Sequence, residues 1–291
     1  MNKAPHAAVI HDLSGFGRCS MTIILPVLAA MGVQCAPMLT AYLSAHTAFP
    51  HRDQALFLDL TDQMEQVCRH WQALDVRFDA IYSGFLGSAR QICRLRHVIS
   101  QFRREDTLVL VDPVMGDHGR PYATYTPEMC ARMAELAGEA DLITPNLTEA
   151  ALLLGEPYHA VPHTIQGLKD WLLRLSVDGR RSVVITGVRV EEGAIGAACF
   201  DRKDGSFAFP RAHEEPQQFP GTGDLFAAVL LGGLLQGKAL DHAAQKAVDF
   251  VQQCAAHTIA LGTPTLEGVQ FEALMGLLTH KMTEEMEFSA P

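Results

Sequence analysis

Residues 108–117 have the sequence Leu-Val-Leu-Val-Asp-Pro-Val-Met-Gly-Asp, an apolar run that ends in polar and turn-forming residues. The first four positions are all apolar instead of alternating with polar ones, which is typical of a strand buried on both faces. Such strands occur in parallel sheets that are covered by helices on each side. The stretch therefore predicts an α/β fold with a mostly parallel central sheet and helices on both faces.

The rest of the chain alternates short apolar runs with longer segments of helical period, as successive strand–helix units do. The predicted strands are 7–10, 34–40, 80–83, 108–112, 141–144 and 182–186, followed by a hairpin of 194–200 and 206–209 around Asp204-Gly205. The predicted helices are 20–31, 53–74, 88–102, 127–138, 147–154, 164–175, 221–236, 240–261 and 267–280. Because no linker or charge block divides the chain, we expect one domain over 1–282 and a loose acidic tail over 283–291.

The composition excludes several classes of protein. With 48% hydrophobic and 19% charged residues among 291, the chain can bury a large core. Its net charge is −10 and its basic residues are scattered, so we expect no nucleic-acid partner. The longest apolar stretch, 225–235, is far shorter than the ~20 residues that span a bilayer, and the first residues do not form a signal peptide; we expect a cytoplasmic protein. Seven cysteines without a Cys-x-x-Cys pair favour reduced thiols.

Gly221, Thr222, Gly223 and Asp224 stand at the start of a long apolar helix. The first N–H groups of a helix lack partners within it, and glycine lets a phosphate approach the backbone without meeting a Cβ. Asp224 can then receive a proton from a hydroxyl while the amides hold the phosphoryl group. The alternative is that Asp224 only caps the helix.

Two carboxylates, Asp112 and Asp117, follow the strand 108–111. Alone they indicate an Asp-Pro turn with a solvated Asp117. Beside an anion-binding helix end, however, they suit a magnesium–phosphate complex, because Mg²⁺ takes oxygen ligands, keeps several waters and bridges phosphate oxygens.

Two further segments end predicted strands. Asn146 and Glu149 have the spacing of a capping box, and they can equally face phosphates and the water shell of a metal. Gly187, after Thr186, leaves room for a nucleotide against the backbone, although a Thr-Gly pair also serves simple turns. Both interpretations stay open for each segment.

The segment 11–18 follows the first predicted strand and contains Gly-x-Gly. Ser20 stands where a dinucleotide-binding loop has its third glycine, so we reject a nicotinamide cofactor. Polar residues here, with 44–47 and 83–85 after the next strands, can line one pocket for a small substrate, since parallel strands end at the same sheet edge. A single histidine such as His46 is also often purely structural.

The chain resembles the ribokinase-like superfamily, and specifically the pyridoxal/pyridoxamine kinases of vitamin B6 salvage, in several segments that occur in a shared order. The segments are 44–47, 112–117, 143–149, 184–187 and 221–228. The resemblance covers residues 7 to 262. It implies a ribokinase-like three-layer sandwich, a homodimer, and transfer of the γ-phosphate of ATP to the 5′-hydroxymethyl group of pyridoxal, pyridoxamine or pyridoxine, with Mg²⁺ and a monovalent cation such as K⁺.

The resemblance also implies roles for single residues. Asp224 resembles the general base, and the amides of Gly221, Thr222 and Gly223 resemble the anion hole. The implied B6 contacts are Asp12, Ser14, His46, Thr47 and Phe85, where relatives often carry a tyrosine in place of Phe85. The implied ATP contacts are Asp112, Tyr122, Asn146, Glu149, Thr186, Gly187 and Thr222. The implied metal side is Asp112, Asp117, Thr144 and Glu149, and 118–126 stands where relatives carry a flap over the nucleotide.

Three alternatives stay open. The nearest is a hydroxymethylpyrimidine kinase of thiamin synthesis, which shares the fold and the reaction but commonly has a cysteine in place of Asp224. A ribokinase-type sugar kinase ranks next, although little sequence is left for a sugar-covering lid. A catalytically silent relative that binds a B6 compound or a nucleotide is disfavoured because Asp224, both neighbouring glycines and both carboxylates of 112–117 are present.

Overall fold

The computed structural model describes residues 3–122 and 125–279, and its centre is a sheet of ten strands. The strand order is β11-β10-β9-β8-β5-β4-β1-β2-β3, and β12 pairs with β10. Pairing is parallel from β2 to β9 and antiparallel at both edges. The strands of this sheet are β1 (His6–Ser14), β2 (Gln34–Leu43), β3 (Phe57–Asp59), β4 (Ala80–Ser83), β5 (Leu108–Val111), β8 (Leu142–Ile143), β9 (Ser182–Val188), β10 (Ala194–Phe200), β11 (Phe207–Ala208) and β12 (Arg211–His213).

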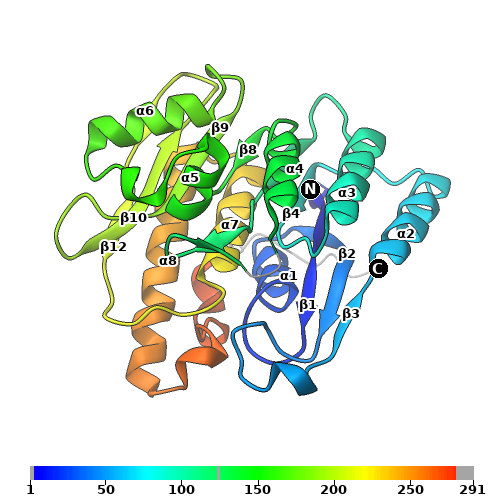
Figure 1. The fold of residues 1–291 in the computed structure, drawn as a ribbon, viewed down its shortest axis with the longest axis horizontal. Helices are drawn as coiled ribbons and strands as arrows, with labels where there is room; N and C mark the ends of the chain where they lie inside the picture. The colour runs from blue at the N-terminus through cyan, green and yellow to red at the C-terminus, as the bar shows by residue number, and fades with distance from the viewer. Residues whose placement is uncertain (1–2, 123–124, 280–291) are drawn as a thin grey trace, which may run out of the picture.

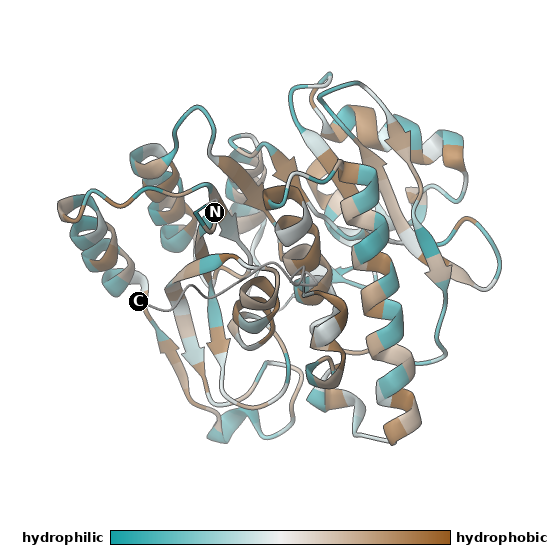
Figure 2. Cartoon of the chain, turned by 180° about the vertical axis from the view of Figure 1, so that it is seen from behind, coloured by the Kyte–Doolittle hydropathy of each residue, from teal (hydrophilic) through white to brown (hydrophobic). Residues whose placement is uncertain are grey.

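Helices cover both faces of the sheet, so the predicted fold class is confirmed (Figure 1). One face carries α1 (Met21–Ala30), α7 (Thr222–Leu235) and α8 (Leu240–Leu261), which are nearest the viewer in Figure 2. The other face carries α2 (Thr61–Ala73), α3 (Ala89–Phe102), α4 (Pro127–Ala137), α5 (Leu147–Leu154) and α6 (Ile165–Leu175). None of the helices in the described ranges combines the length and the apolar character needed to cross a bilayer.

The strands feed two separate cores because their side chains alternate between the faces. In β1, Ala7 and Val9 belong to the core under α1, α7 and α8, whereas Ala8 and Ile10 belong to the core under the other helices. Both sets are fully buried. This double burial is why the strands are apolar at successive positions instead of alternating with polar residues.

Helix α7 begins without a side-chain cap, unlike α5. Its N-cap, Gly221, has a φ of 79°, in the left-handed region, and a Cβ there would overlap the carbonyl oxygen of Arg18. In α5, by contrast, the Asn146 side chain accepts from the amide of Glu149, whose carboxylate accepts from the amide of Asn146. The first N–H groups of α7 are therefore available to an anion.

Two predicted helices and several strand ends are wrong; β2, for example, extends to Leu43 and β9 to Val188, beyond the predicted 40 and 186. β1 extends to Ser14, so Asp12 and Ser14 lie in a strand and not in a loop. Residues 57–59 form the edge strand β3 against β2, because cross-strand pairing outweighs local helical preference, and α2 begins only at Thr61.

The region after α8 also differs from the prediction. Instead of one helix over 267–280, it has two short 3₁₀ helices, η3 (Thr265–Glu267) and η4 (Glu272–Leu277). Gly268 between them has a φ of 78° and breaks any continuous helix. His280 and the predicted tail 283–291 lie outside the described residues. The edges of the sheet also contain short strands that the sequence does not predict, β3 and β12. A strand of three residues is too short to show a measurable hydrophobic period.

Candidate active site

Two cavities adjoin at the carboxyl-terminal edge of the parallel strands, on either side of the first turn of α7. The smaller has a volume of about 220 Å³ and the larger about 630 Å³. Tyr122 and Pro220 line both cavities. Asp224 lines only the smaller one, whereas Thr222 and Gly223 line only the larger one. A single helical turn thus presents a carboxylate to one cavity and backbone amides to the other.

The residues that the resemblance assigns to the B6 ring all line the smaller cavity. They are Asp12, Ser14, His46, Thr47 and Phe85. Gly221 also lines it, at the start of α7. His46 is fastened to the backbone, since its Nε2 lies 2.7 Å from the carbonyl oxygen of Leu266.

The Asp224 carboxylate is turned toward β1 and the start of α1. Its Oδ2 accepts a hydrogen bond of 2.7 Å from the Ser20 amide, and its Oδ1 lies 3.2 Å from Nε2 of His11. Neither contact involves an N–H group of α7. The structure therefore favours a role for Asp224 in the cavity over the alternative that it only caps its helix.

His11, which the sequence places only among the polar residues of segment 11–18, contacts both carboxylates of the smaller cavity. Its Nδ1 lies 2.8 Å from Oδ1 of Asp12 and its ring is 2% exposed. Burial alone lowers the pKa of His11, but the hydrogen bonds and charges of Asp12 and Asp224 outweigh it and raise this pKa to about 10. The same contacts, with the hydroxyls of Ser14 and Ser20, lower the pKa of Asp12 despite its burial. The sequence contained one signal for this contact, a histidine directly after the predicted strand 7–10 and next to Asp12.

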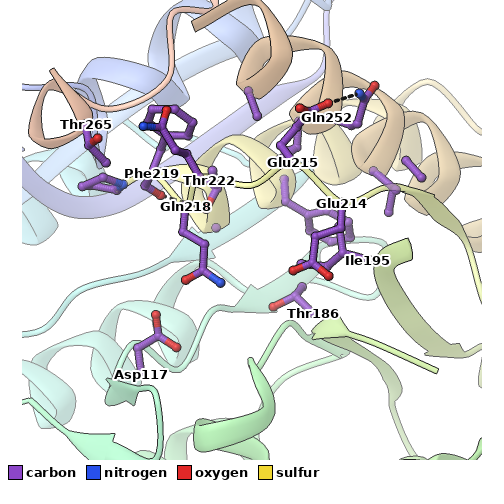
Figure 3. A pocket seen from close by; sticks show the side chains of 18 of the residues that line it. Asp117, Thr186, Ile195, Glu214, Glu215, Gln218, Phe219, Thr222, Gln252 and Thr265 are labelled. Atoms are coloured by element: carbon purple, nitrogen blue, oxygen red, sulfur yellow. Dashed lines mark hydrogen bonds between the residues drawn. The ribbon is translucent and has the colours of Figure 1, made fainter. Parts of the chain in front are cut away.

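The larger cavity contains several predicted residues and many that no motif marks. Asp117, Thr186 and Thr222 line it as predicted for the nucleotide side, with Asp117 pointing toward its interior (Figure 3). Unpredicted lining residues come from β10, from the segment after β12 and from α8. They include Ile195, Glu214, Glu215, Gln218, Phe219 and Gln252. Gln252 donates a hydrogen bond of 2.7 Å to Glu215.

Asp112 and Glu149 form a buried acidic pair. Burial and the negative charge of Asp224 raise the pKa of Asp112 to about 7, although the positive charge of His11 opposes this. Burial and the charge of Asp112 raise the pKa of Glu149 well above its ordinary value, even though the amides of Asn146 and Met115 donate to its carboxylate. Neither acid is among the residues that line the two cavities.

The remaining predicted residues are placed by local structure. The side-chain amide of Asn146 donates to the carbonyl oxygen of Gly116, so it fastens the hairpin of β6 (Gly116–Asp117) and β7 (Arg120–Pro121) to α5. The Thr144 hydroxyl is buried without a hydrogen-bond partner. Gly187 has a φ of 72° within β9. Of the segment predicted to act as a flap, residues 123 and 124 lie outside the described chain.

A metal ion would have to be held by few protein ligands here. Across 3–122 and 125–279, no three His, Cys, Asp or Glu side chains are grouped so as to hold a metal. Such a group is not needed for Mg²⁺ bound with a nucleotide, which commonly has one or two carboxylates, waters and phosphate oxygens around it.

A comparison with protein families identifies the chain. The family model described as phosphomethylpyrimidine kinase matches residues 25–267, which is most of the sequence. The chain belongs to the phosphomethylpyrimidine kinase family. The matched range includes both cavity walls at α7, both carboxylates of 112–117 and the capping box of α5.

Individual relatives of this kinase carry names from vitamin B6 metabolism. A pyridoxine/pyridoxal/pyridoxamine kinase of Bordetella avium is 30% identical over 249 residues, 84% of this chain and 82% of the relative. A candidate phosphomethylpyrimidine kinase of Bacteroides thetaiotaomicron, crystallised with pyridoxal, is 40% identical with a TM-score of 0.89, covering 96% of this chain and 98% of the other. Pyridoxal kinase of Lactobacillus plantarum is 33% identical with a TM-score of 0.86, covering 94% and 96%. The resemblance to B6 kinases of the ribokinase-like superfamily is confirmed.

Proposed function

We propose that this kinase transfers the γ-phosphate of ATP to the 5′-hydroxymethyl group of a B6 vitamer: pyridoxal, pyridoxamine or pyridoxine. The observation that carries the proposal is the first turn of α7, which lies between two adjoining cavities. Asp224 lines the smaller cavity, and Thr222 and Gly223 line the larger one. An acceptor alcohol and a nucleotide that occupied these cavities would meet at this turn.

The sizes of the two cavities suit this division. Ligand pockets for drug-sized molecules are about 300–1,000 Å³, and the larger cavity, at about 630 Å³, falls within that range. The smaller one, at about 220 Å³, suits a single substituted ring. Relatives support the choice of ring, because the Bacteroides structure contains pyridoxal and the Lactobacillus protein is named a pyridoxal kinase.

In the proposed reaction Asp224 accepts the hydroxymethyl proton as the new O–P bond forms and the bond from the γ-phosphorus to the bridging oxygen breaks, which releases ADP. Phosphoryl transfer has a loose transition state, so the protein contributes positioning and charge stabilisation instead of covalent chemistry. The N–H groups at the start of α7 stabilise the negative charge of the transferred group. Gly223 leaves this approach open, since a Cβ there would meet nothing within 4 Å.

The acidic pair Asp112 and Glu149 fits a divalent cation on the phosphate side. The charge of Asp224 beside Asp112, the charge of Asp112 beside Glu149 and the unpaired hydroxyl of Thr144 are the features that a bound cation would relieve. We assign these three residues to Mg²⁺ or its water shell, with Asp117 at the cavity wall. When bound, Mg²⁺ would neutralise charge on the nucleotide phosphates. Asn146, Thr186, Gly187 and Tyr122 complete the proposed ATP side.

Four further features belong to the proposal. A homodimer and a contribution of K⁺ rest on the resemblance, whereas a cytoplasmic location and a single domain over 1–282 rest on the sequence. Size-exclusion chromatography with light scattering tests the dimer, and activity with and without K⁺ at fixed ionic strength tests the monovalent cation.

A coupled ADP-release assay with purified protein tests the reaction. We expect MgATP-dependent turnover with at least one of pyridoxal, pyridoxamine and pyridoxine, and slower turnover with hydroxymethylpyrimidine. Preference for hydroxymethylpyrimidine would instead support a kinase of thiamin synthesis. Tight binding of a B6 vitamer without any ADP release would support the catalytically silent alternative and overturn the proposal.

A further inference from the structure

His11 has two polar neighbours at each of its ring nitrogens. Nδ1 lies 2.8 Å from Oδ1 of Asp12 and 2.9 Å from the Asp12 amide nitrogen. Nε2 lies 3.2 Å from Oδ1 of Asp224 and 3.3 Å from the amide nitrogen of Phe85. A protonated nitrogen can donate to the carboxylate, and an unprotonated nitrogen can accept from the amide. The ring therefore keeps a partner at both ends in either protonation state.

Ser20 joins the same two carboxylates by a second path. Its amide donates to Oδ2 of Asp224 and its hydroxyl donates to Oδ1 of Asp12, both at 2.7 Å. Ser20 holds this position with a φ of 54°, an unusual conformation for a residue with a side chain. His11, Asp12, Ser20 and Asp224 thus form a closed ring of three hydrogen bonds and one ion-pair contact, the latter between His11 and Asp224. The two oxygens of Asp224 are held from β1 and from the start of α1.

Gly84 provides the space for the imidazole. A Cβ at this position would overlap Nε2 and Cδ2 of His11, although the backbone of Gly84 is not in the left-handed region. Gly84 itself is buried, and its amide donates to the carbonyl oxygen of Ile10. An alanine here would therefore push against the imidazole without changing the charge of the site.

We propose that His11 is a positioning residue, which fixes the carboxylate of Asp224 and couples it to Asp12, another residue that lines the smaller cavity. The inference rests on the proposed function, in which Asp224 is the base and Asp12 contacts the B6 ring. A vitamer that binds against Asp12 would then meet a base already held at the orientation needed for its hydroxymethyl group. A carboxylate released from this ring could rotate, and misplacement of a catalytic group is costly.

His11→Asn and Gly84→Ala test the inference by different means. The first removes the imidazole, and the second displaces it while keeping every titratable group. We expect each variant to lower kcat at least ~10-fold, with the KM for ATP changed less than ~2-fold because the larger cavity is untouched. The double variant should lose little more than the worse single one, since both changes act through the same carboxylate.

Gly87→Ala is the matched control, because it lies in the same loop and its Cβ would make only an ordinary contact with Phe57. We expect it to retain wild-type kcat. Circular dichroism and thermal melting establish that each variant is folded. Wild-type kcat in a folded His11→Asn variant, or a rise in the KM for ATP equal to the loss in kcat, would overturn the positioning role. Absence of B6 phosphorylation by the wild-type protein would instead overturn the proposed function.

Discussion

The smaller and the larger cavity differ in how their polar side chains are held. Around the smaller one, Asp12 and Asp224 are joined through His11 and Ser20 by a closed ring of hydrogen bonds and one ion-pair contact. Around the larger one, polar side chains come from separate segments, and Gln252 and Glu215 are one pair that contact each other. Under the proposed function, the groups next to the reacting atoms are held in place, whereas the nucleotide site can depend on shape and backbone amides.

The contrast between the two cavities would not hold if Asp224 could be replaced without loss of activity. We expect Asp224→Asn to lower kcat by ~100-fold or more, the usual scale for losing a general base, with little change in melting temperature because the side chain lies at a cavity wall. ADP release measures kcat. Asp241→Asn is the matched control, since Asp241 occupies the first turn of the neighbouring helix α8 and lines neither cavity. Near-normal turnover of Asp224→Asn would remove this residue from the mechanism.

A second test asks whether the positive charge of His11, paired with Asp12 and Asp224, stabilises the folded protein. The pKa of His11 is raised from 6.5 to about 10 in the folded protein. Its stabilising contribution is therefore complete below pH 6.5 and is lost as the pH rises through about 10. Between these limits we expect wild type to lose on the order of 2 kcal/mol more of its unfolding free energy than His11→Asn. Denaturant melts across this range check it, and parallel curves would contradict it.

Gly221 and Gly223, in the first turn of α7, are expected to be glycine for different reasons: Gly221 for the backbone conformation and Gly223 for the approach of the phosphate. Gly223→Ala meets no neighbouring atom and keeps an ordinary φ, so we expect a normal melting temperature. Its methyl group would obstruct the phosphate, and we expect a loss of about tenfold in kcat/KM for ATP, or ~1.4 kcal/mol. Gly221→Ala should instead melt earlier, because its left-handed φ and the Arg18 carbonyl oxygen exclude a Cβ. Equal stability of the two variants would contradict this assignment.

The smallest effect is expected at the far wall of the larger cavity. Gln252→Ala removes the hydrogen bond to Glu215, and both side chains are only partly buried. We expect the KM for ATP to rise no more than about fivefold, which corresponds to about 1 kcal/mol, with kcat unchanged. A kcat loss as large as that of Asp224→Asn would show that the two cavities are not organised differently.

Much of the fold follows from local patterns. The helices α5 and α8 begin and end where predicted, because a capping box and a left-handed glycine mark their ends. Strand β3 and the 3₁₀ helices after α8 are missed, since pairing with β2 and the conformation of Gly268 are decided outside the local pattern. The helix predicted over 53–74 is wrong at its start, because hydrophobic period alone does not reveal that residues 57–59 pair with β2.

The candidate site divides in the same way. Residues on recognisable motifs, such as Asp224 and Gly223, are found from the sequence because their chemistry depends on neighbours one to four positions away. The contact of His11 with Asp224 could not be predicted, because Asp224 lies more than two hundred residues later in the chain. The walls of the larger cavity contributed by Glu214 and Gln252 carry no motif for the same reason.

The sequence by itself determined the parallel sheet, its helical cover and the glycine turn at the start of α7, since each arises from hydrophobic period or from glycine backbone freedom within a short segment. Only the tertiary structure decided that this turn separates two cavities and that a buried imidazole holds its carboxylate. Burial and charge pairing depend on which distant strands and helices meet, and that information is spread over the whole chain.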